Sequence, residues 1–385
     1  MTDDKISQWY VVRKDKWLLA FLTYIPVLLA VVLWWIFSQG IIRDLPIGVV
    51  DLDNSVVSKQ LIRDFDATSF MSVDRSYPDV AAAKHALSGG EIYAYVVVPR
   101  NFYRDIAIGN PPRLSVFYNS QYILIGKLIN SAITQAHGAF NAKIGVSKQL
   151  SKGNNTMLSA IGKAVPIQHQ INQLFNRNGN YTSFLVSGII PALWQVFIVT
   201  SIVLVLSANH RIYGLRRMLG HRPLRRLVSI CTFYMPVYIL MGFGFLSWFY
   251  GGLGWPSEGH LLPLVYAQLL TIIACVIMGS FFFFVTMDPA RAVSFAGVFT
   301  APSFAFMGIT FPVSDMSLPA IFWRNMLPIC YYIEAQIGQI SYGVSSWHTI
   351  RDITPPMLGY IIPLWITVQL MKRNLSKQEA GHVAE

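Results

Sequence analysis

The stretch ANHRIYGLRRMLGHRPLRRL, residues 208–227, decides the fold because it is strongly basic and lies between two long apolar runs. It contains no carboxylate, and its arginines are Arg211, Arg216, Arg217, Arg222, Arg225 and Arg226. Short loops rich in Lys and Arg stay on the cytoplasmic side of a membrane. The stretch therefore predicts two membrane spans joined by a cytoplasmic loop. Two roles stay open for the arginines: a docking site for a soluble partner, and a plain topology signal.

Composition places the chain among polytopic membrane proteins. Its 385 residues are 54% hydrophobic and only 13% charged, whereas soluble domains carry about 25% charged residues. The net charge is +11, but no basic cluster is backed by a soluble aromatic platform, which argues against nucleic acid as a partner. The cysteines lack CxxC spacing and predict neither a disulfide framework nor a metal site; they are Cys231, Cys275 and Cys330.

Six apolar runs are expected to cross a hydrocarbon core of about 30 Å. The first is kinked near Pro26, and the runs are 17–37, 183–207, 228–252, 261–287, 292–311 and 355–371. Lys and Arg gather on one side of these runs, which predicts that both termini are cytoplasmic. The N-terminal segment 1–16 is expected to be cytoplasmic and amphipathic, either as an interfacial helix or as a disordered tail, and 372–385 is a cytoplasmic tail.

Residues 38–182 have the composition of a soluble domain. Strands are expected at 45–52, 70–73, 92–99 and 113–119, with helices between them and two further helices at 121–150 and 158–175. Strands that alternate with helices predict a small α/β or α+β domain. The expected fold is thus an α-helical polytopic membrane protein with six transmembrane helices and an α/β extracytoplasmic (periplasmic) domain inserted between helices 1 and 2. Residues 183–371 form the rest of the membrane part.

The sequence offers no means of powering transport by itself. No phosphate-binding loop is present, because the Gly-Lys pairs at 126–127 and 162–163 lack the upstream Gly and the hydroxyl residue. The middles of the predicted spans hold no ionisable residue; their main polar groups are Gln195, Gln268 and Gln369. Ion-coupled transporters need ionisable groups inside the membrane. Energy must therefore enter through a partner, and 208–227 is the accessible surface. No catalytic, cofactor-binding or metal-ligating residue is expected.

Three further features have a plain and a functional interpretation. Asp51 and Asp53 follow a strand, where turn chemistry is favoured over a cation site. Glu334 is either the carboxylate of a re-entrant helix or an interfacial residue paired with Arg324, and the pairing is favoured. The aromatic run at 281–284 is expected to face lipid or pack in the core, rather than to form a substrate cage.

Five segments carry a resemblance to a known family. They are LPIGVVDLDNS (45–55), SGGEIYAYVVVPRNF (88–102), LFNRNGNYTSFLVSG (174–188), FMGITFPVSDMSLP (306–319) and LPICYYIEAQ (327–336). Together they resemble the permease, or membrane subunit, of ABC-2 type exporters that have a large extracytoplasmic domain between the first two spans. The resemblance covers essentially the whole chain, and the order of the parts agrees.

The resemblance implies a dimer of permeases, as homodimer or heterodimer, in a bacterial inner membrane. A separate cytoplasmic ABC ATPase, which carries the ATP and Mg, would bind the loop between spans two and three, and a periplasmic adaptor is a further partner. The implied ATPase-coupling residues are Arg211, Tyr213, Gly214, Arg216, Arg217, Arg222, Pro223, Arg225 and Arg226. The implied outer re-entrant segment is 313–354, with Phe311, Pro312, Arg324, Pro328 and Glu334 as its key residues.

The loop departs from the family pattern. The family's usual acidic residue, Gly-Thr pair and Lys are missing; this chain has RIYGL at 211–215 and then Pro223. Ser187 replaces the usual Pro before Gly188. The leading hypothesis is the permease of an ATP-driven exporter for an amphiphilic drug or lipid. One alternative is a non-transporting anchor or receptor that displays the outer domain, and another is a secondary transporter.

Overall fold

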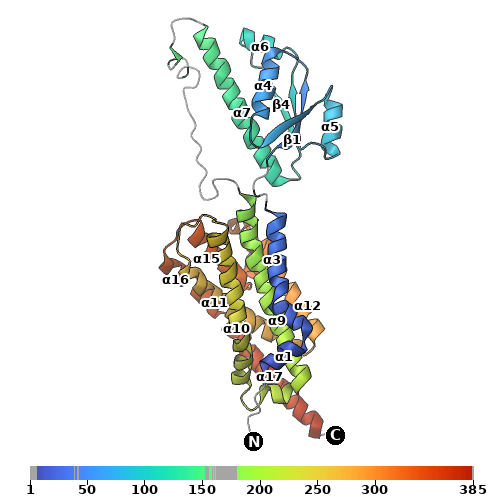
Figure 1. Cartoon of the computed structure of the whole chain (residues 1–385), viewed down its shortest axis with the longest axis vertical. Helices are drawn as coiled ribbons and strands as arrows, with labels where there is room; N and C mark the ends of the chain where they lie inside the picture. The colour runs from blue at the N-terminus through green and yellow to red at the C-terminus, as the bar shows by residue number, and fades with distance from the viewer. Residues whose placement is uncertain are drawn as a thin grey trace. The chain divides into compact units, whose positions relative to one another are not determined.

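A computed structural model describes residues 7–38, 40, 43–151, 156, 157, 159, 161 and 180–383 (Figure 1). The chain divides into two compact units, one made of residues 1–40 with 173–385 and the other of residues 41–172. We call them the helical unit and the inserted unit. The helix expected at 158–175 falls almost entirely outside the described residues.

The inserted unit contains a four-stranded mixed sheet in the order β2-β1-β3-β4. Strand β1 pairs in parallel with both β2 and β3, whereas β3 and β4 are antiparallel. The strands are β1 (Leu45–Asp51), β2 (Met71–Ser76), β3 (Ala94–Val98) and β4 (Ser115–Tyr118), and the helices are α4 (Val56–Asp66), α5 (Val80–Ser88), α6 (Phe102–Ile108) and α7 (Ile123–Leu150). The predicted alternation of strands and helices is thus present. Helix α5 begins two residues after Pro78, because Asp79 caps it by accepting from the backbone N–H of Ala82.

Both faces of the central strands β1 and β3 are covered, which explains why these two strands are almost continuously apolar. Successive side chains of a strand point to opposite faces. Accordingly, Ile47 and Val96 pack with Phe65 of α4 and Phe140 of α7, while Tyr95 belongs to a second cluster. That second cluster also holds Val50, Ala83, Ala86 and Ile92. The turn after β1 uses Asp51, which accepts from the N–H groups of Asp53 and Asn54.

The helical unit combines short helices that precede the inserted unit in the chain with the longer helices that follow it (Figure 1). Its elements are α1 (Gln8–Lys14), α2 (Lys16–Leu22), α3 (Tyr24–Ile36), α9 (Tyr181–Leu219), α10 (Pro223–Leu246), the π-helix η1 (Ser247–Gly252), α11 (Leu262–Thr286), α12 (Pro289–Thr300), α13 (Ser303–Phe306), the 3-10 turn η2 (Val313–Asp315), α14 (Leu318–Asn325), α15 (Pro328–Ile340), α16 (Ser346–Leu358) and α17 (Ile361–Val383). Helix α11 is central, since it packs against α9, α10, α12, α15, α16 and α17.

Within the described residues, four helical runs are long and apolar enough to cross a membrane, or five if one bent pair is a single span. The four are 182–219, 223–252, 262–286 and 346–378, and the bent pair is α2 with α3, which meet at 45°. The prediction of an α-helical polytopic membrane protein is confirmed at this level, and the strands of the inserted unit form a small mixed sheet. The bend lies at Thr23, three residues before Pro26, because a proline ring clashes with the carbonyl four residues earlier, here that of Leu22.

The run expected as a fifth span, 292–311, is not one helix. Helix α12 ends at Thr300, and α13 begins only after Pro302. Twelve helical residues extend about 18 Å, which is short of a hydrocarbon core of about 30 Å. The run expected from Pro355 also differs, since Pro355 lies inside α16 and the helix breaks after Leu358. The arrangement with six spans therefore remains a prediction.

One end of the helical unit collects nearly all of its positive charge, and we call it the basic end. The C-terminal parts of α9 and α11 lie side by side: the ring centroids of His210 and Phe283 are 6.0 Å apart. Asn374 of α17 donates to the carbonyl of Phe284 at 2.9 Å. The basic end carries Arg13, Lys14, Lys16, Arg211, Arg216, Arg217, Arg222, Arg225, Arg226, Arg291, Lys372, Arg373 and Lys377. The opposite end, where α9 begins and η1 finishes, is called the far end.

Candidate functional site

The stretch 208–227 is mainly helical and not an open loop. Helix α9 continues to Leu219, a turn follows at 220–222, and Pro223 begins α10 as its first residue. Leu215, Met218 and Leu219 are at most 3% exposed. Their burial holds the segment against the bundle, so that the arginines on its other side face outward. Arg211, Arg216, Arg217, Arg222 and Arg225 are exposed, and Arg226 is half-buried.

Gly214 breaks α9 within the stretch 208–227. Its backbone angles are φ 72° and ψ 160°, a region that only glycine occupies without strain. A Cβ at this position would meet nothing within 4 Å, so the glycine is required by its conformation and not by crowding. The break makes Leu215–Leu219 a short helical segment of its own, which we call the basic segment. Arg217 lies over the ring of Tyr213, 5.9 Å from its centroid.

Helix α1 is fixed to the base of α9 by a buried set of polar side chains. Gln8 donates from Nε2 to Oδ1 of Asn209 at 3.0 Å, and Asn209 returns a bond from Nδ2 to Oε1 of Gln8 at 3.2 Å. The hydroxyl of Tyr234, on α10, donates to the same Gln8 oxygen at 3.0 Å. Asn209 is fully buried and Gln8 is 8% exposed. We call these three residues the amide clamp; it joins α1, α9 and α10.

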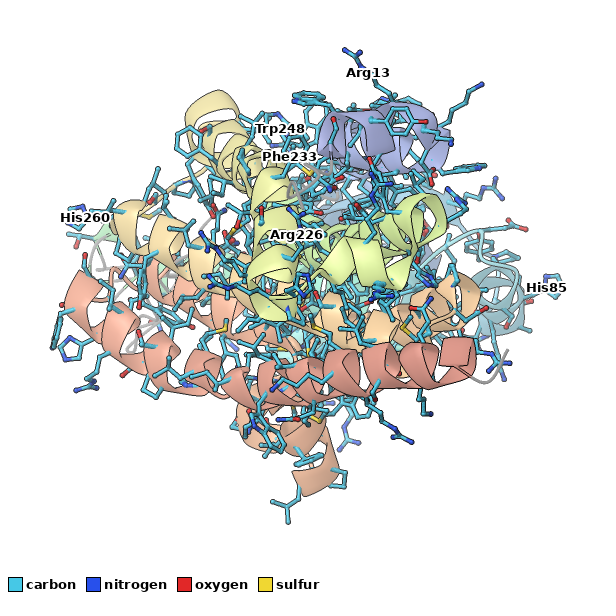
Figure 2. All side chains as sticks on the ribbon, turned by 90° about the horizontal axis from the view of Figure 1, so that it is seen from below. Arg13, His85, Arg226, Phe233, Trp248 and His260 are labelled. Atoms are coloured by element: carbon cyan, nitrogen blue, oxygen red, sulfur yellow. The ribbon has the colours of Figure 1, made fainter. Side chains whose placement is uncertain are left out.

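Asp15 makes a second connection at the corner between α1 and α2. Its Oδ1 accepts from the N–H groups of Trp17 and Leu18 and caps α2, while its Oδ2 accepts from Nη2 of Arg211 at 2.7 Å. Figure 2 shows this end of the helical unit, with Arg13 projecting outward from α1 and Arg226 at the start of α10. The N-terminal segment is thus helical from Gln8 to Lys14 and contacts the elements on either side of the basic segment.

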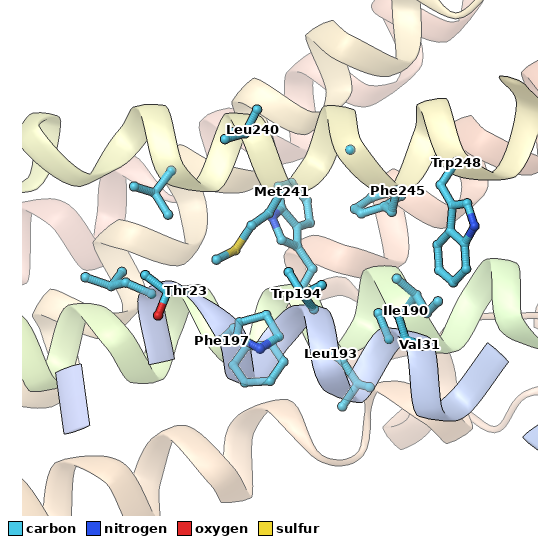
Figure 3. Close-up of a pocket in the computed structure, with 16 residues that line it drawn as sticks. Thr23, Val31, Ile190, Leu193, Trp194, Phe197, Leu240, Met241, Phe245 and Trp248 are labelled. Carbon is cyan, nitrogen blue, oxygen red and sulfur yellow. The ribbon is translucent and has the colours of Figure 1, made fainter. Parts of the chain in front are cut away.

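An apolar groove lies between α2–α3, α9 and α10 (Figure 3). Its volume is about 610 Å³, within the range of small-molecule pockets, about 300–1,000 Å³. Val31, Phe197, Met241 and Trp248 are among its lining side chains. Its walls belong to helices that qualify as membrane spans, so the groove suits hydrocarbon.

Two polar side chains in the groove are satisfied by backbone carbonyls. The hydroxyl of Thr23 donates to the carbonyl of Leu19 at 2.7 Å, and Nε1 of Trp194 donates to that of Tyr238 at 3.1 Å. The Thr23 hydroxyl and the Trp194 Nε1–H therefore need no hydrogen-bond acceptor from a molecule bound in the groove. The surface left for an occupant is therefore mainly apolar.

The segment 313–354 contains α14, α15 and the start of α16, and glutamines fix α15 in the bundle. Gln195 of α9 accepts from the N–H of Ile329 at 2.9 Å and donates to the hydroxyl of Ser303 at 2.9 Å. Gln268 of α11 donates to the carbonyl of Gly242 at 2.8 Å and to the hydroxyl of Tyr332 at 3.4 Å. Two of the three glutamines noted in the spans thus connect helices, whereas Gln369 is exposed.

The outer-segment residues do not form one cluster. Phe311 and Pro312 are exposed and precede η2, and Pro328 is buried at the start of α15. Arg324 and Glu334 do pair, with Nη2 of the arginine 2.7 Å from Oε2 of the carboxylate. The arginine side chain is 7% exposed and the glutamate side chain 67%, so Glu334 faces outward and carries the pair's solvent-accessible part.

The amide clamp has no counterpart among the sequence predictions. Gln8 and Asn209 are 201 positions apart, and Gln8 and Tyr234 are 226 apart. Their only local signal is polarity: Gln8 lies in a helix with Val11 and Val12 on its buried side, and Asn209 lies at the end of an apolar run.

Comparison with known proteins then identifies the chain. A family model described as ABC-2 family transporter protein matches residues 16–369. No curated relative and no solved structure gives a significant match. The family match includes the groove, the basic segment and the glutamines Gln195 and Gln268, and it extends through the inserted unit. The protein therefore belongs to the ABC-2 family of transporters, as a membrane subunit with no catalytic role of its own.

Proposed function

We propose that this chain is the permease subunit of an ATP-driven exporter that moves an amphiphilic molecule, such as a drug or a lipid, out of the cytoplasm or the inner membrane. ATP and Mg act on a separate ABC ATPase. The permease works as a homodimer or heterodimer in a bacterial inner membrane, with both termini in the cytoplasm. The inserted unit lies on the outer side, where a periplasmic adaptor binds it.

The observation that carries this proposal is the basic segment. It is exposed and rich in arginine on one side, buried through Leu215, Met218 and Leu219 on the other, and separated from the rest of α9 at Gly214. A partner that pulls or pushes on this segment acts directly on two candidate spans, α9 and α10. The amide clamp extends the same surface to α1.

The nature of the substrate is supported by the groove. Its walls are apolar and lie within candidate spans, which favours molecules with a hydrocarbon part. Within the described residues, the middles of the candidate spans hold no Asp, Glu, Lys, Arg or His, which supports an external energy source over ion coupling. Charge at the basic end supports the proposed orientation through the positive-inside rule.

The test is co-purification with the ABC ATPase encoded nearest to this chain in its genome. Replacing Arg216, Arg217, Arg225 and Arg226 by Ala is expected to abolish co-purification and substrate-stimulated ATP hydrolysis. Arg291→Ala is the matched control, because Arg291 is an exposed arginine at the same end in a different turn. Full ATPase binding by the fourfold variant would show that the basic segment is not the docking site.

A further inference from the structure

A second pocket lies at the far end of the helical unit, away from the groove. Its volume is about 380 Å³. It is bounded by the first turns of α9, by η1 and the turn after it, by residues 308–309 and by α15. Aromatic side chains supply much of its wall: Phe184, Tyr250, Trp255 and Tyr342. Tryptophan and tyrosine favour the depth at which a membrane meets water, and here they surround a cavity.

Gln336 is a buried polar residue at the wall of this cavity. Its side chain lines the pocket, and the residue is only 3% exposed. Nε2 donates to the backbone carbonyl of Ser187 at 2.9 Å. That bond fixes the orientation of the amide, because a carbonyl accepts only from the nitrogen. Among the residues that the structure describes, Oε1 of Gln336 then has no hydrogen-bond partner.

An unpartnered buried acceptor is costly, and native proteins normally satisfy such atoms. The other glutamine on this helix shows the contrast. Gln339 donates to the carbonyl of Val344 and to the hydroxyl of Thr349, both at 2.7 Å, and its Oε1 accepts from the N–H of His260 at 3.1 Å. Gln339 is thus satisfied on both sides of its amide, whereas Gln336, a residue that lines the aromatic cavity, has an acceptor with no partner among the described residues.

We propose that this pocket binds an amphiphile through a hydroxyl or ammonium group that donates to Oε1 of Gln336. The apolar part of the molecule packs against the aromatic walls. An acceptor cannot bond a group that lacks a hydrogen, so ethers, esters and quaternary ammonium groups are disfavoured. That this molecule is the exporter's cargo rests on the proposed function; the binding itself needs neither ATP nor a partner.

The experiment uses the full chain in nanodiscs of phosphatidylcholine, a lipid whose headgroup has no hydrogen-bond donor. Tryptophan emission is titrated with two matched pairs of probes: 1-octanol against octyl methyl ether, and octylammonium against octyltrimethylammonium. The signal of the pocket is identified by its loss in Trp255→Phe. The donor-bearing member of each pair is expected to bind about tenfold more tightly, from the difference that one buried hydrogen bond makes.

Variants of α15 assign the preference to one residue. Gln336→Met keeps the length of the side chain and removes the amide, so the alcohol should bind no better than the ether. Gln339→Met is the matched control and should retain the preference. Gln336→Glu, which keeps an acceptor, should favour the ammonium over the alcohol, and it tests the site even if the methionine variant does not fold.

Two results would overturn the proposal: equal binding within both pairs to the unmodified chain, or a donor preference that survives Gln336→Met. The first would mean that the pocket does not select a hydrogen-bond donor, and the second that an acceptor other than Gln336 does. Adding phosphatidylethanolamine to the nanodiscs separates two sources of the ligand. Competition with octanol identifies a bilayer headgroup, and its absence identifies a free amphiphile. Failure of this binding leaves the export function standing, and failure of export leaves the binding result standing.

Discussion

Arg211 and Asp15 form an ion pair of 2.7 Å that joins the last turns of α9 to the corner between α1 and α2. The aspartate also caps α2 with its other oxygen. The arginine side chain is 71% exposed and the carboxylate 15%. The charge interaction is therefore screened by solvent and is worth at most about 1 kcal/mol. The cap is the stronger of the two contributions of Asp15, since N-caps contribute about 1 kcal/mol on average.

Replacing Asp15 separates these two contributions. Asp15→Asn keeps a capping oxygen and loses the charge, so it should cost less than about 1 kcal/mol. Asp15→Ala loses both and should cost roughly 1–2 kcal/mol in thermal unfolding of the purified chain. A salt titration provides the check: the loss in Asp15→Asn should vanish at high ionic strength, while most of the loss in Asp15→Ala should remain.

Gln8→Leu is expected to release α1 from the bundle. The substitution leaves Asn209 and the Tyr234 hydroxyl without their Gln8 partner, and an unpaired buried polar group costs about 1–3 kcal/mol. Trypsin should then cleave faster after Arg13 and Lys14, which lie at the end of α1. The exposed Gln369 supplies the control substitution, Gln369→Leu. An unchanged cleavage rate in Gln8→Leu would mean that the clamp contributes little to docking.

Gly214→Ala is expected to strain or straighten α9 at its break. A residue with a Cβ at φ 72° and ψ 160° costs roughly 1–3 kcal/mol. The position of the basic segment should change, with lower substrate-stimulated ATP hydrolysis in the complex. Gly297→Ala is the control, because this glycine of α12 also has open space around it and sits in regular helix, where alanine adds roughly 0.5–1 kcal/mol of stability. Equal stability of the two variants would contradict the assigned strain.

Gln195→Leu is expected to loosen α15. The variant leaves the N–H of Ile329 and the hydroxyl of Ser303 without the Gln195 side chain, and both sites are buried. The thermal unfolding midpoint should fall by an amount that corresponds to about 1–3 kcal/mol. Hydrogen exchange in the first turn of α15 should rise at the same time. A fall in stability without faster exchange there would point to general destabilisation instead.

Much of the architecture follows from sequence patterns. The β-branched runs in β1 and β3 are buried on both faces, and their composition alone indicates strands. Long apolar runs likewise mark α9, α10 and α11. The break before Ser303 was missed because 292–311 is apolar throughout, and overall hydropathy conceals the effect of a single Pro302. The helical form of 208–227 was missed because its apolar residues are few, yet Leu215, Met218 and Leu219 are buried.

The candidate site was less accessible to sequence reasoning. The position of the arginines could be predicted, since charge between apolar runs is a local pattern. The amide clamp could not, because a glutamine and an asparagine 201 positions apart give no local spacing. The unpartnered acceptor of Gln336 could not be predicted either. Gln336 and Gln339 are glutamines of the same helix, and only the fold gives them different hydrogen-bond partners.

Helix α9 is hydrogen-bonded to other elements near both of its ends and in its middle. Ser187 contacts α15 near one end, Gln195 contacts Ser303 and Ile329 in the middle, and Asn209 contacts α1 near the other end. The 22 residues from Ser187 to Asn209 span about 33 Å, and the break at Gly214 lies beyond them. This part of α9 contains Pro191, which cannot donate a backbone hydrogen bond within the helix. A tilt of about 5° over this length would shift one end by about 3 Å relative to the other, so a tilt of α9 at the amide clamp would displace the wall of the aromatic pocket.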